Sequence, residues 1–96
     1  MASVRKKKAI QGRKVRDDGE FEVWAKPLVD GTRAVVLLNR SNAQANISVS
    51  WTEIGYPTNL TFAVQDLWQK KNLGKYKGLF TAKVPSHAVV MVKIKS

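Results

Sequence analysis

The sequence predicts an all-β domain, an antiparallel sandwich or barrel. Short apolar segments alternate with polar residues at a period of two, which is typical of strands with one buried face. Turn-forming Gly, Pro and Asn residues separate these segments at short intervals. No segment longer than a single turn has the spacing of a helix. A chain of 96 residues has room for one domain.

The alternation is clearest near the start of the chain. Phe21, Val23 and Ala25 alternate with polar residues and with Trp24, so the Trp24 side chain is expected to face away from the core. Asp-Gly at residues 30–31 predicts a hairpin turn. The strands expected from such patterns are residues 12–15, 20–26, 33–39, 45–51, 61–68, 79–84 and 87–94.

Residues 35–38 (VVLL) and 89–92 (VVMV) are apolar at consecutive positions. This indicates central strands whose second face is also covered. Trp51 continues an apolar strand face and is predicted to be a core residue. It begins a single helical turn that Gly55 stops.

Residues 67–78 (LWQKKNLGKYKG) combine four lysines with Trp68 and Tyr76. Cationic segments with stacking aromatic rings are used to bind nucleic acids. The alternative is the end of a strand followed by a connection, with Gly74 and Gly78 at turns and the lysines in solvent. We favour this second interpretation and keep nucleic-acid binding as a less favoured hypothesis.

The net charge, the first nine residues and the length of the apolar runs indicate which kinds of partner are expected. Seventeen Lys and Arg against seven Asp and Glu give a net charge of +10, which favours salt-sensitive association with polyanions. Residues 1–9 are expected to form a basic, disordered tail, with a nucleic-acid or nuclear-targeting arm as the alternative. The longest uncharged apolar run, residues 34–38, is too short to span a bilayer, so no membrane partner is expected.

The sequence offers little chemistry for catalysis. His87, the single histidine, lies after Pro85 at the start of a strand and is interpreted as a turn or hydrogen-bonding residue. Four acidic residues are interpreted as a charged loop that leads into the solvated face of a strand: Asp17, Asp18, Glu20 and Glu22. There is no cysteine, and no cluster of potential ligands predicts a metal or other cofactor.

Three Asn-X-Ser/Thr triplets predict possible N-glycosylation at Asn39, Asn46 and Asn59. They favour a secreted protein, or one from a lysosome-like or vacuole-like compartment.

Several segments, in order, carry a family resemblance: residues 11–15 (QGRKV), 22–28 (EVWAKPL), 30–31 (DG), 34–40 (AVVLLNR), 49–55 (VSWTEIG), 66–68 (DLW), 73–74 (LG), 78, 84–87 (VPSH) and 89–91 (VVM). Together they resemble the C-terminal domain of family 27 α-galactosidases (melibiases). The resemblance covers residues 10–95. It departs at residues 6–9 and at Ala88, where the family commonly has glycine.

The resemblance implies a Greek-key-like β-sandwich of about seven or eight strands, at residues 10–96, that follows a (β/α)8 barrel. In that family, two aspartates on the barrel hydrolyse terminal α-galactosides with retention. Neither aspartate motif is found in this chain, so no catalytic residue is carried over.

Two functions follow as hypotheses. The first is a non-catalytic accessory domain that packs against the barrel of an α-galactosidase and stabilises it, with Trp24 as an anchor. The second is a carbohydrate-binding module for galactose-containing saccharides, in which Trp24, Trp68 and Tyr76 would stack on sugar rings. The second hypothesis requires at least two coplanar exposed rings.

Overall fold

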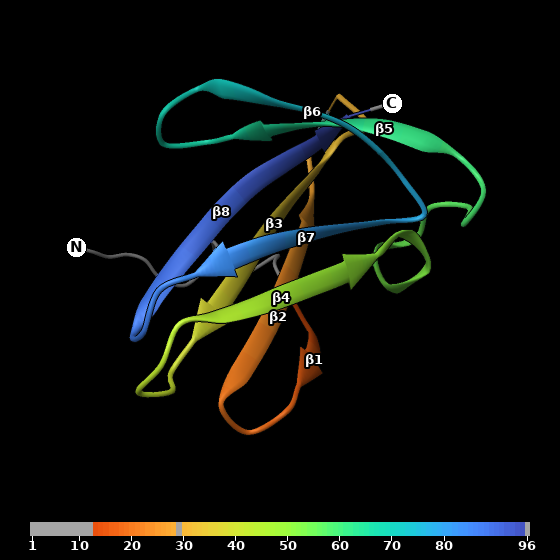
Figure 1. Ribbon diagram of the computed structural model, residues 1–96. Helices are drawn as coiled ribbons and strands as arrows, with labels where there is room; N and C mark the ends of the chain where they lie inside the picture. The colour runs from red at the N-terminus through yellow and green to blue at the C-terminus, as the bar shows by residue number, and fades with distance from the viewer. Residues whose placement is uncertain (1–12, 29, 96) are drawn as a thin grey trace.

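The computed structural model describes residues 13–28 and 30–95, and it shows two antiparallel sheets that pack face to face (Figure 1). The antiparallel β-sandwich expected from the sequence is confirmed. The expected tail at residues 1–9 lies outside the described residues. The elements are β1 (Arg13–Asp17), β2 (Phe21–Pro27), β3 (Arg33–Asn39), β4 (Ala45–Ser50), the 3-10 turn η3 (Trp51–Ile54), β5 (Thr61–Asp66), β6 (Lys71–Lys77), β7 (Leu79–Val84) and β8 (Ala88–Lys95).

The large sheet has the strand order β1-β2-β3-β8-β5-β6, and the small sheet consists of β4 and β7. The two segments that were apolar at consecutive positions, β3 and β8, are neighbours in the middle of the large sheet. They pair along their length from Arg33–Ile94 to Asn39–Ala88. In the described part of the chain, no helix is long and apolar enough to cross a membrane.

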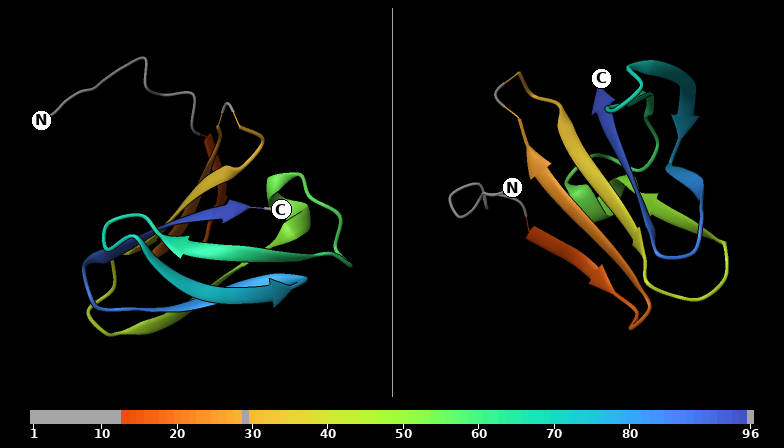
Figure 2. Two further views of the ribbon diagram at one scale, coloured as in Figure 1. Left: turned by 90° about the horizontal axis from the view of Figure 1, so that it is seen from above. Right: turned by 90° about the vertical axis from the view of Figure 1, so that its left-hand side faces the viewer.

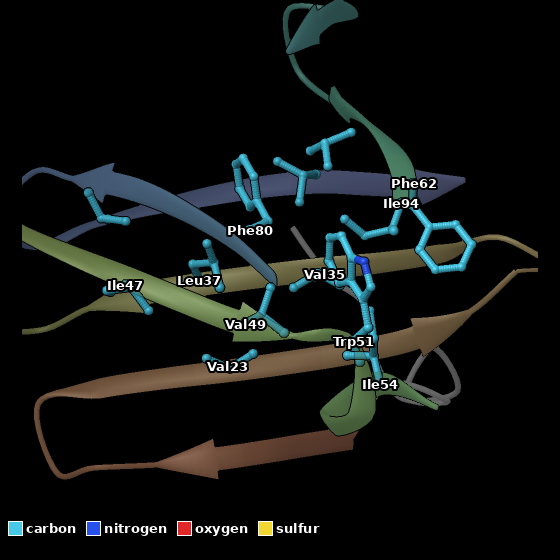
Figure 3. Close-up of a cluster of buried hydrophobic side chains, with 14 residues drawn as sticks. Val23, Val35, Leu37, Ile47, Val49, Trp51, Ile54, Phe62, Phe80 and Ile94 are labelled. Atoms are coloured by element: carbon cyan, nitrogen blue, oxygen red, sulfur yellow. The ribbon is translucent and has the colours of Figure 1, made fainter. Parts of the chain in front are cut away.

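The core lies between the two sheets (Figure 3). The large sheet supplies Val23, Val35, Leu37, Phe62, Val64, Val92 and Ile94, and the small sheet supplies Ile47, Val49, Phe80 and Val84. These side chains come from alternate positions of their strands, because successive side chains of a strand point to opposite faces. Burying each one contributes about 1.5–3 kcal/mol to folding.

The η3 turn closes one end of the core. Trp51 is fully buried, as the sequence predicted, and its indole Nε1 donates a 2.9 Å hydrogen bond to the carbonyl oxygen of Leu60. Its ring meets that of Phe62 edge to face, with the centroids 5.7 Å apart. Gly55 ends the turn at φ 89°, a conformation that favours glycine because it has no Cβ.

The prediction of a connection at residues 69–78 is wrong, because residues 71–77 form the edge strand β6. β6 pairs with β5 from Thr61–Lys77 to Asp66–Lys71, with an irregularity beside Val64 that leaves Gly74 at φ 104°. As an edge strand with mostly exposed side chains, β6 lacks the apolar alternation that reveals a half-buried strand. The prediction that the lysines of this segment are exposed is confirmed: Lys70, just before β6, and Lys71, Lys75 and Lys77, within it, are all in solvent.

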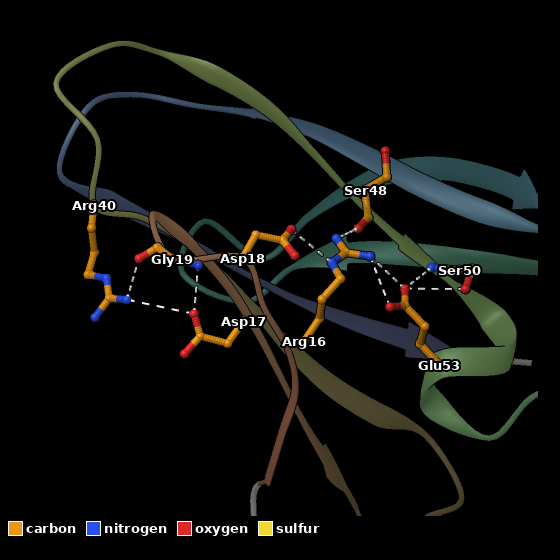
Figure 4. Close-up of polar contacts among 8 residues, drawn as sticks. All are labelled: Arg16, Asp17, Asp18, Gly19, Arg40, Ser48, Ser50 and Glu53. Atoms are coloured by element: carbon orange, nitrogen blue, oxygen red, sulfur yellow. Dashed lines mark hydrogen bonds and ion pairs between the residues drawn. The ribbon is translucent and has the colours of Figure 1, made fainter.

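An arginine connects β1 to the opposite sheet (Figure 4). Nη1 of Arg16 donates to both carboxylate oxygens of Glu53 in η3, at 2.9 Å each, and Nη2 donates to the carbonyl oxygen of Ser48 in β4. The same Glu53 carboxylate accepts from the backbone N–H of Ser50 at 2.9 Å. These charge-assisted contacts tie the edge strand β1 to β4 and η3.

Candidate docking surface

The outer face of the large sheet carries apolar side chains in its middle. We call Trp24, Val36, Leu38, Val89 and Met91 the apolar patch. Trp24 pairs with Val36, which pairs with Met91, and Leu38 pairs with Val89 in the next row. Paired side chains on one face lie about 4.5–5.5 Å apart at Cβ, so the five form one contiguous surface. Trp24 is 36% exposed, and the other four side chains are half-buried.

No described strand or helix covers this patch. In the right-hand view of Figure 2, β1, β2, β3 and β8 lie side by side, with η3 behind them. The cover that the sequence predicted for the second face of β3 and β8 is therefore not supplied by residues 13–28 or 30–95. The outer face of the small sheet is different, since five of its six positions are polar, namely Asn46, Ser48, Ser50, Thr81 and Lys83, and the sixth is Leu79.

Trp24 is held in place by polar contacts at its edge. Its Nε1 donates a 2.9 Å hydrogen bond to Oε1 of Glu22, and Nζ of Lys14 lies 5.5 Å from its ring centroid. Glu22 is only 6% exposed, so its assignment to the solvated face of the strand was wrong. Ion pairs explain the burial, because the Glu22 carboxylate lies 2.8 Å from Arg40 and 3.8 Å from Lys14.

The charges beside Trp24 are balanced. A hydrogen bond with Asp17 raises the pKa of Lys14 above its ordinary value. The backbone N–H of Gly19, and then Lys14, lower the pKa of Asp17. Two carboxylates, Asp17 and Glu22, thus face two cations, Lys14 and Arg40, at this end of the sheet.

The other end of the same face is basic. We call Lys26, Lys75, Lys93 and Lys95 the lysine strip. Lys26 and Lys93 flank Ala34 in one row, and Lys95 and Lys75 flank Ala63 in the next. Along β8 the outward residues run Val89, Met91, Lys93, Lys95, so the strip directly adjoins the apolar patch.

One carboxylate lies beside the lysine strip. Asp30 in the β2–β3 turn lies 3.4 Å from Nζ of Lys93. Hydrogen bonds from the hydroxyl and backbone N–H of Thr32, followed by Lys93, lower the pKa of Asp30 to about 2. Asp30 is therefore ionised at neutral pH and neutralises one of the four lysines.

The structure does not bring Trp24, Trp68 and Tyr76 into one platform. Trp24 lies on the outer face of β2, whereas Tyr76 pairs with the core residue Phe62 and so belongs to the inner face of β6. The Tyr76 ring meets Phe80 edge to face at 4.9 Å, and its hydroxyl donates to the carbonyl oxygen of Leu73. Trp68 lies in the turn after β5 and is 61% exposed.

The predicted glycosylation sites differ in accessibility. Asn39 is fully buried, and its amide nitrogen donates to the carbonyl oxygens of Ala43 and Val84 at 2.9 and 3.0 Å. A glycan on that nitrogen is incompatible with this packing. Asn46, on the outer face of β4, and Asn59, before β5, are exposed and stay predicted acceptors.

His87 occupies a turn, as expected from the sequence, with φ 54° and a 3.0 Å hydrogen bond between its Nε2 and Oδ1 of Asn42. Among the described residues, no group of His, Cys, Asp and Glu side chains could hold a metal ion.

Residues 18–94 match the model of the family described as the α-galactosidase C-terminal β-sandwich domain. The chain belongs to this family. It is 39% identical over 85 residues to the α-galactosidase of Cyamopsis tetragonoloba, a match that covers 88% of this chain and 21% of that protein. The chain thus spans about a fifth of the length of the curated relatives it matches.

Two solved structures show the same sandwich. α-Galactosidase I from Mortierella vinacea matches with a TM-score of 0.83 and 26% identity, over 86% of this chain and 22% of that one. A family 27 β-L-arabinopyranosidase from Geobacillus stearothermophilus matches with a TM-score of 0.82 and 26% identity, over 88% and 19%. The resemblance stated from the sequence is therefore confirmed, and the chain is the accessory sandwich domain of this enzyme family.

Sequence reasoning identified Trp24 but missed most of the candidate docking surface. Val36, Leu38, Val89 and Met91 were interpreted as doubly covered strand residues, and Lys26, Lys93 and Lys95 were not singled out. The signal was the two consecutive apolar runs, whose second apolar face is not covered by any strand or helix of the described residues.

Proposed function

We propose that this domain is the non-catalytic C-terminal part of an α-galactosidase-type glycosidase. In this proposal it packs through the apolar patch against the catalytic (β/α)8 barrel and stabilises that barrel. The hydrolysis of the glycoside belongs to the barrel, and the sandwich contributes neither nucleophile nor acid.

The observation that carries the proposal is the chemical difference between the two outer faces of the sandwich. The large sheet exposes the apolar patch around Trp24 and Met91, whereas the small sheet exposes mainly Ser, Thr, Asn and Lys. A contiguous apolar surface rimmed by polar residues is typical of an interface. The relatives are about five times longer than this chain, so they contain enough further chain to cover such a surface.

The family members also bear on specificity. One solved relative is named an α-galactosidase and the other a β-L-arabinopyranosidase, yet both contain this sandwich. This favours a structural role for the domain over a role in choosing the sugar, because the same fold accompanies two different sugar preferences.

The alternative, a saccharide-binding module, finds less support. Stacking on a sugar needs exposed rings in one plane, and Tyr76 is turned inward onto Phe80. The two exposed rings of the three lie on different elements, Trp24 on the outer face of β2 and Trp68 in the turn after β5. Titration of the isolated chain with galacto-oligosaccharides at millimolar concentration, followed by NMR, distinguishes the two: shifts centred on Trp68 would favour the module.

The proposal is tested in the Cyamopsis tetragonoloba enzyme. Its segment matched by this chain is deleted in one variant and replaced by residues 10–96 in a second. We expect the fusion to lose activity on a chromogenic α-galactoside at elevated temperature severalfold more slowly than the deletion variant, with similar kcat/KM. Equal rates of inactivation would contradict the proposal.

A matched pair of variants tests whether protection of the barrel requires the apolar patch or only a fused sandwich domain. Met91→Lys places a charge in the apolar patch, whereas Thr81→Lys places the same charge on the outer face of the small sheet. We expect Met91→Lys to abolish the protection of the barrel and Thr81→Lys to preserve it. Thermal melts of the two isolated domains check that both remain folded.

A further inference from the structure

The lysine strip makes the two ends of the outer face of the large sheet chemically different. Apolar residues occupy the rows of Val89 and Met91, and lysines occupy the next two rows along the same strands. Of the four lysines, Lys93 has a nearby carboxylate, that of Asp30 at 3.4 Å. Lys75 and Lys95 are exposed and flank the small side chain of Ala63, which leaves both ammonium groups accessible from the outer side.

We propose that the barrel surface that covers this face is apolar opposite Trp24 and Met91 and carries carboxylates opposite the lysine strip. This inference rests on the proposed function and adds the chemistry and the orientation of the partner surface. The lysines then act as a rim: they steer the encounter and fix the register, while the apolar patch supplies most of the affinity.

Charge complementarity also decides against a second copy of this chain as the occupant. Three carboxylates on or beside this face are already paired, Asp17 with Lys14, Glu22 with Arg40 and Asp30 with Lys93, and the exposed Glu20 precedes β2 at the Trp24 end of the face. Among the described residues of this face, a second copy would therefore bring Glu20 but none of these three paired carboxylates to the four-lysine strip, and two molecules of net charge +10 repel each other. A barrel surface with carboxylates at its rim would supply partners for the lysines and would attract the chain instead of repelling it.

The test uses the barrel of the Cyamopsis tetragonoloba α-galactosidase, produced without the segment that this chain matches, as an immobilised probe. The proposal extends to this barrel because the two sandwiches are 39% identical. Binding of the 96-residue chain is measured by interferometry from 0.05 to 0.5 M NaCl. We expect Kd to rise as salt is added, because salt screens attraction between exposed charges.

Three charge reversals locate the effect. Lys75→Glu and Lys95→Glu lie in the strip, and the control Lys83→Glu makes the same change at an exposed strand position on the opposite face of the sandwich. At 0.05 M NaCl we expect each strip variant to bind roughly tenfold more weakly and the control to bind like the unmodified chain. At 0.5 M NaCl the difference should largely disappear.

Each outcome is informative. Equal weakening by all three variants, or binding that does not depend on salt, would overturn the acidic rim but leave the docking function intact. Failure of the unmodified chain to bind at every salt concentration would contradict the docking function itself. Binding of a DNA or RNA oligonucleotide that depends on Lys75 and Lys95, without binding to the barrel, would assign the strip to a nucleic acid instead.

Discussion

The indole Nε1 of Trp24 donates a 2.9 Å hydrogen bond to Glu22, which lies two residues earlier on the same face of β2. The carboxylate that accepts this bond is itself held by Arg40, which follows β3. The exposed ring at the edge of the apolar patch is thus fixed through a buried charge. A fixed ring loses little conformational entropy when a partner binds, which is what an interface anchor requires.

Removal of the Glu22 charge is expected to destabilise the domain. Glu22→Gln keeps an oxygen that accepts from Trp24 but leaves Arg40 without its close carboxylate. We expect the free energy of unfolding, measured in urea, to fall by about 1–3 kcal/mol. The control Glu20→Gln changes an exposed side chain and should stay within about 0.5 kcal/mol. Equal effects of the two changes would show that the buried ion pairs do not matter.

The same substitution should cost much more stability at Trp51 than at Trp68. Trp51→Phe removes a fully buried ring volume and the hydrogen bond to Leu60, and we expect a loss of about 2–4 kcal/mol. Trp68→Phe changes a ring that is 61% exposed and should cost less than about 0.5 kcal/mol. Denaturation followed by circular dichroism is suitable, because both variants alter the fluorescence. A large cost for Trp68 would mean that its ring packs in solution.

The contact between Arg16 and Glu53 should appear as a coupling energy. A double-mutant cycle with Arg16→Met and Glu53→Gln isolates their interaction from other effects of the two substitutions. Both side chains are partly exposed, at 32% and 24%, and one Arg16 nitrogen is shared by the two carboxylate oxygens, so we expect a coupling of about 0.5–1 kcal/mol. A coupling close to zero would indicate that the ion pair does not hold β1, which leaves its pairing with β2 and the bond from Arg16 to Ser48.

Asp30 should contribute to the acid stability of the domain. Its pKa is about 2 in the folded chain and 3.8 ordinarily, so folding favours the ionised form. Its stabilising contribution is therefore complete above pH 3.8 and is lost as the pH falls towards 2. Asp30→Asn should lower stability at pH 6 and have little effect at pH 2.

The Asp30 midpoint can be observed directly by NMR titration of its carboxyl carbon. Thr32→Val removes the hydroxyl donor that contributes most to the shift, so the midpoint should move up towards 3.8. An unchanged midpoint would mean that Lys93 or the backbone N–H is the main cause.

The isolated chain should associate weakly with itself through the apolar patch, and added salt should strengthen this association by screening the repulsion between the lysine strips. Sedimentation velocity between 0.05 and 0.5 M NaCl measures the effect. Met91→Lys should suppress the association and Thr81→Lys should not. Association that weakens with salt would instead require carboxylates that pair with the strip.

Local patterns were informative wherever one face of a strand is buried. The alternation at residues 21–25 placed Val23 inside and Trp24 outside, and the structure has both there. β6 had no such pattern, because its side chains are mostly exposed and its pairing with β5 depends on backbone hydrogen bonds. Backbone hydrogen bonds do not require a particular pattern of side chains, so the sequence pattern predicted a connection where the structure has a strand.

By itself, the sequence determined the sandwich, the family and the outward direction of Trp24. These follow from the period of apolar residues and from ordered motifs, which are local properties of the chain. The tertiary structure alone decided that Glu22 is buried, that Tyr76 faces the core and that Lys26, Lys75, Lys93 and Lys95 share one surface. Strand order and register bring residues from β2, β6 and β8 onto one face, and neither is encoded in the spacing along a single strand.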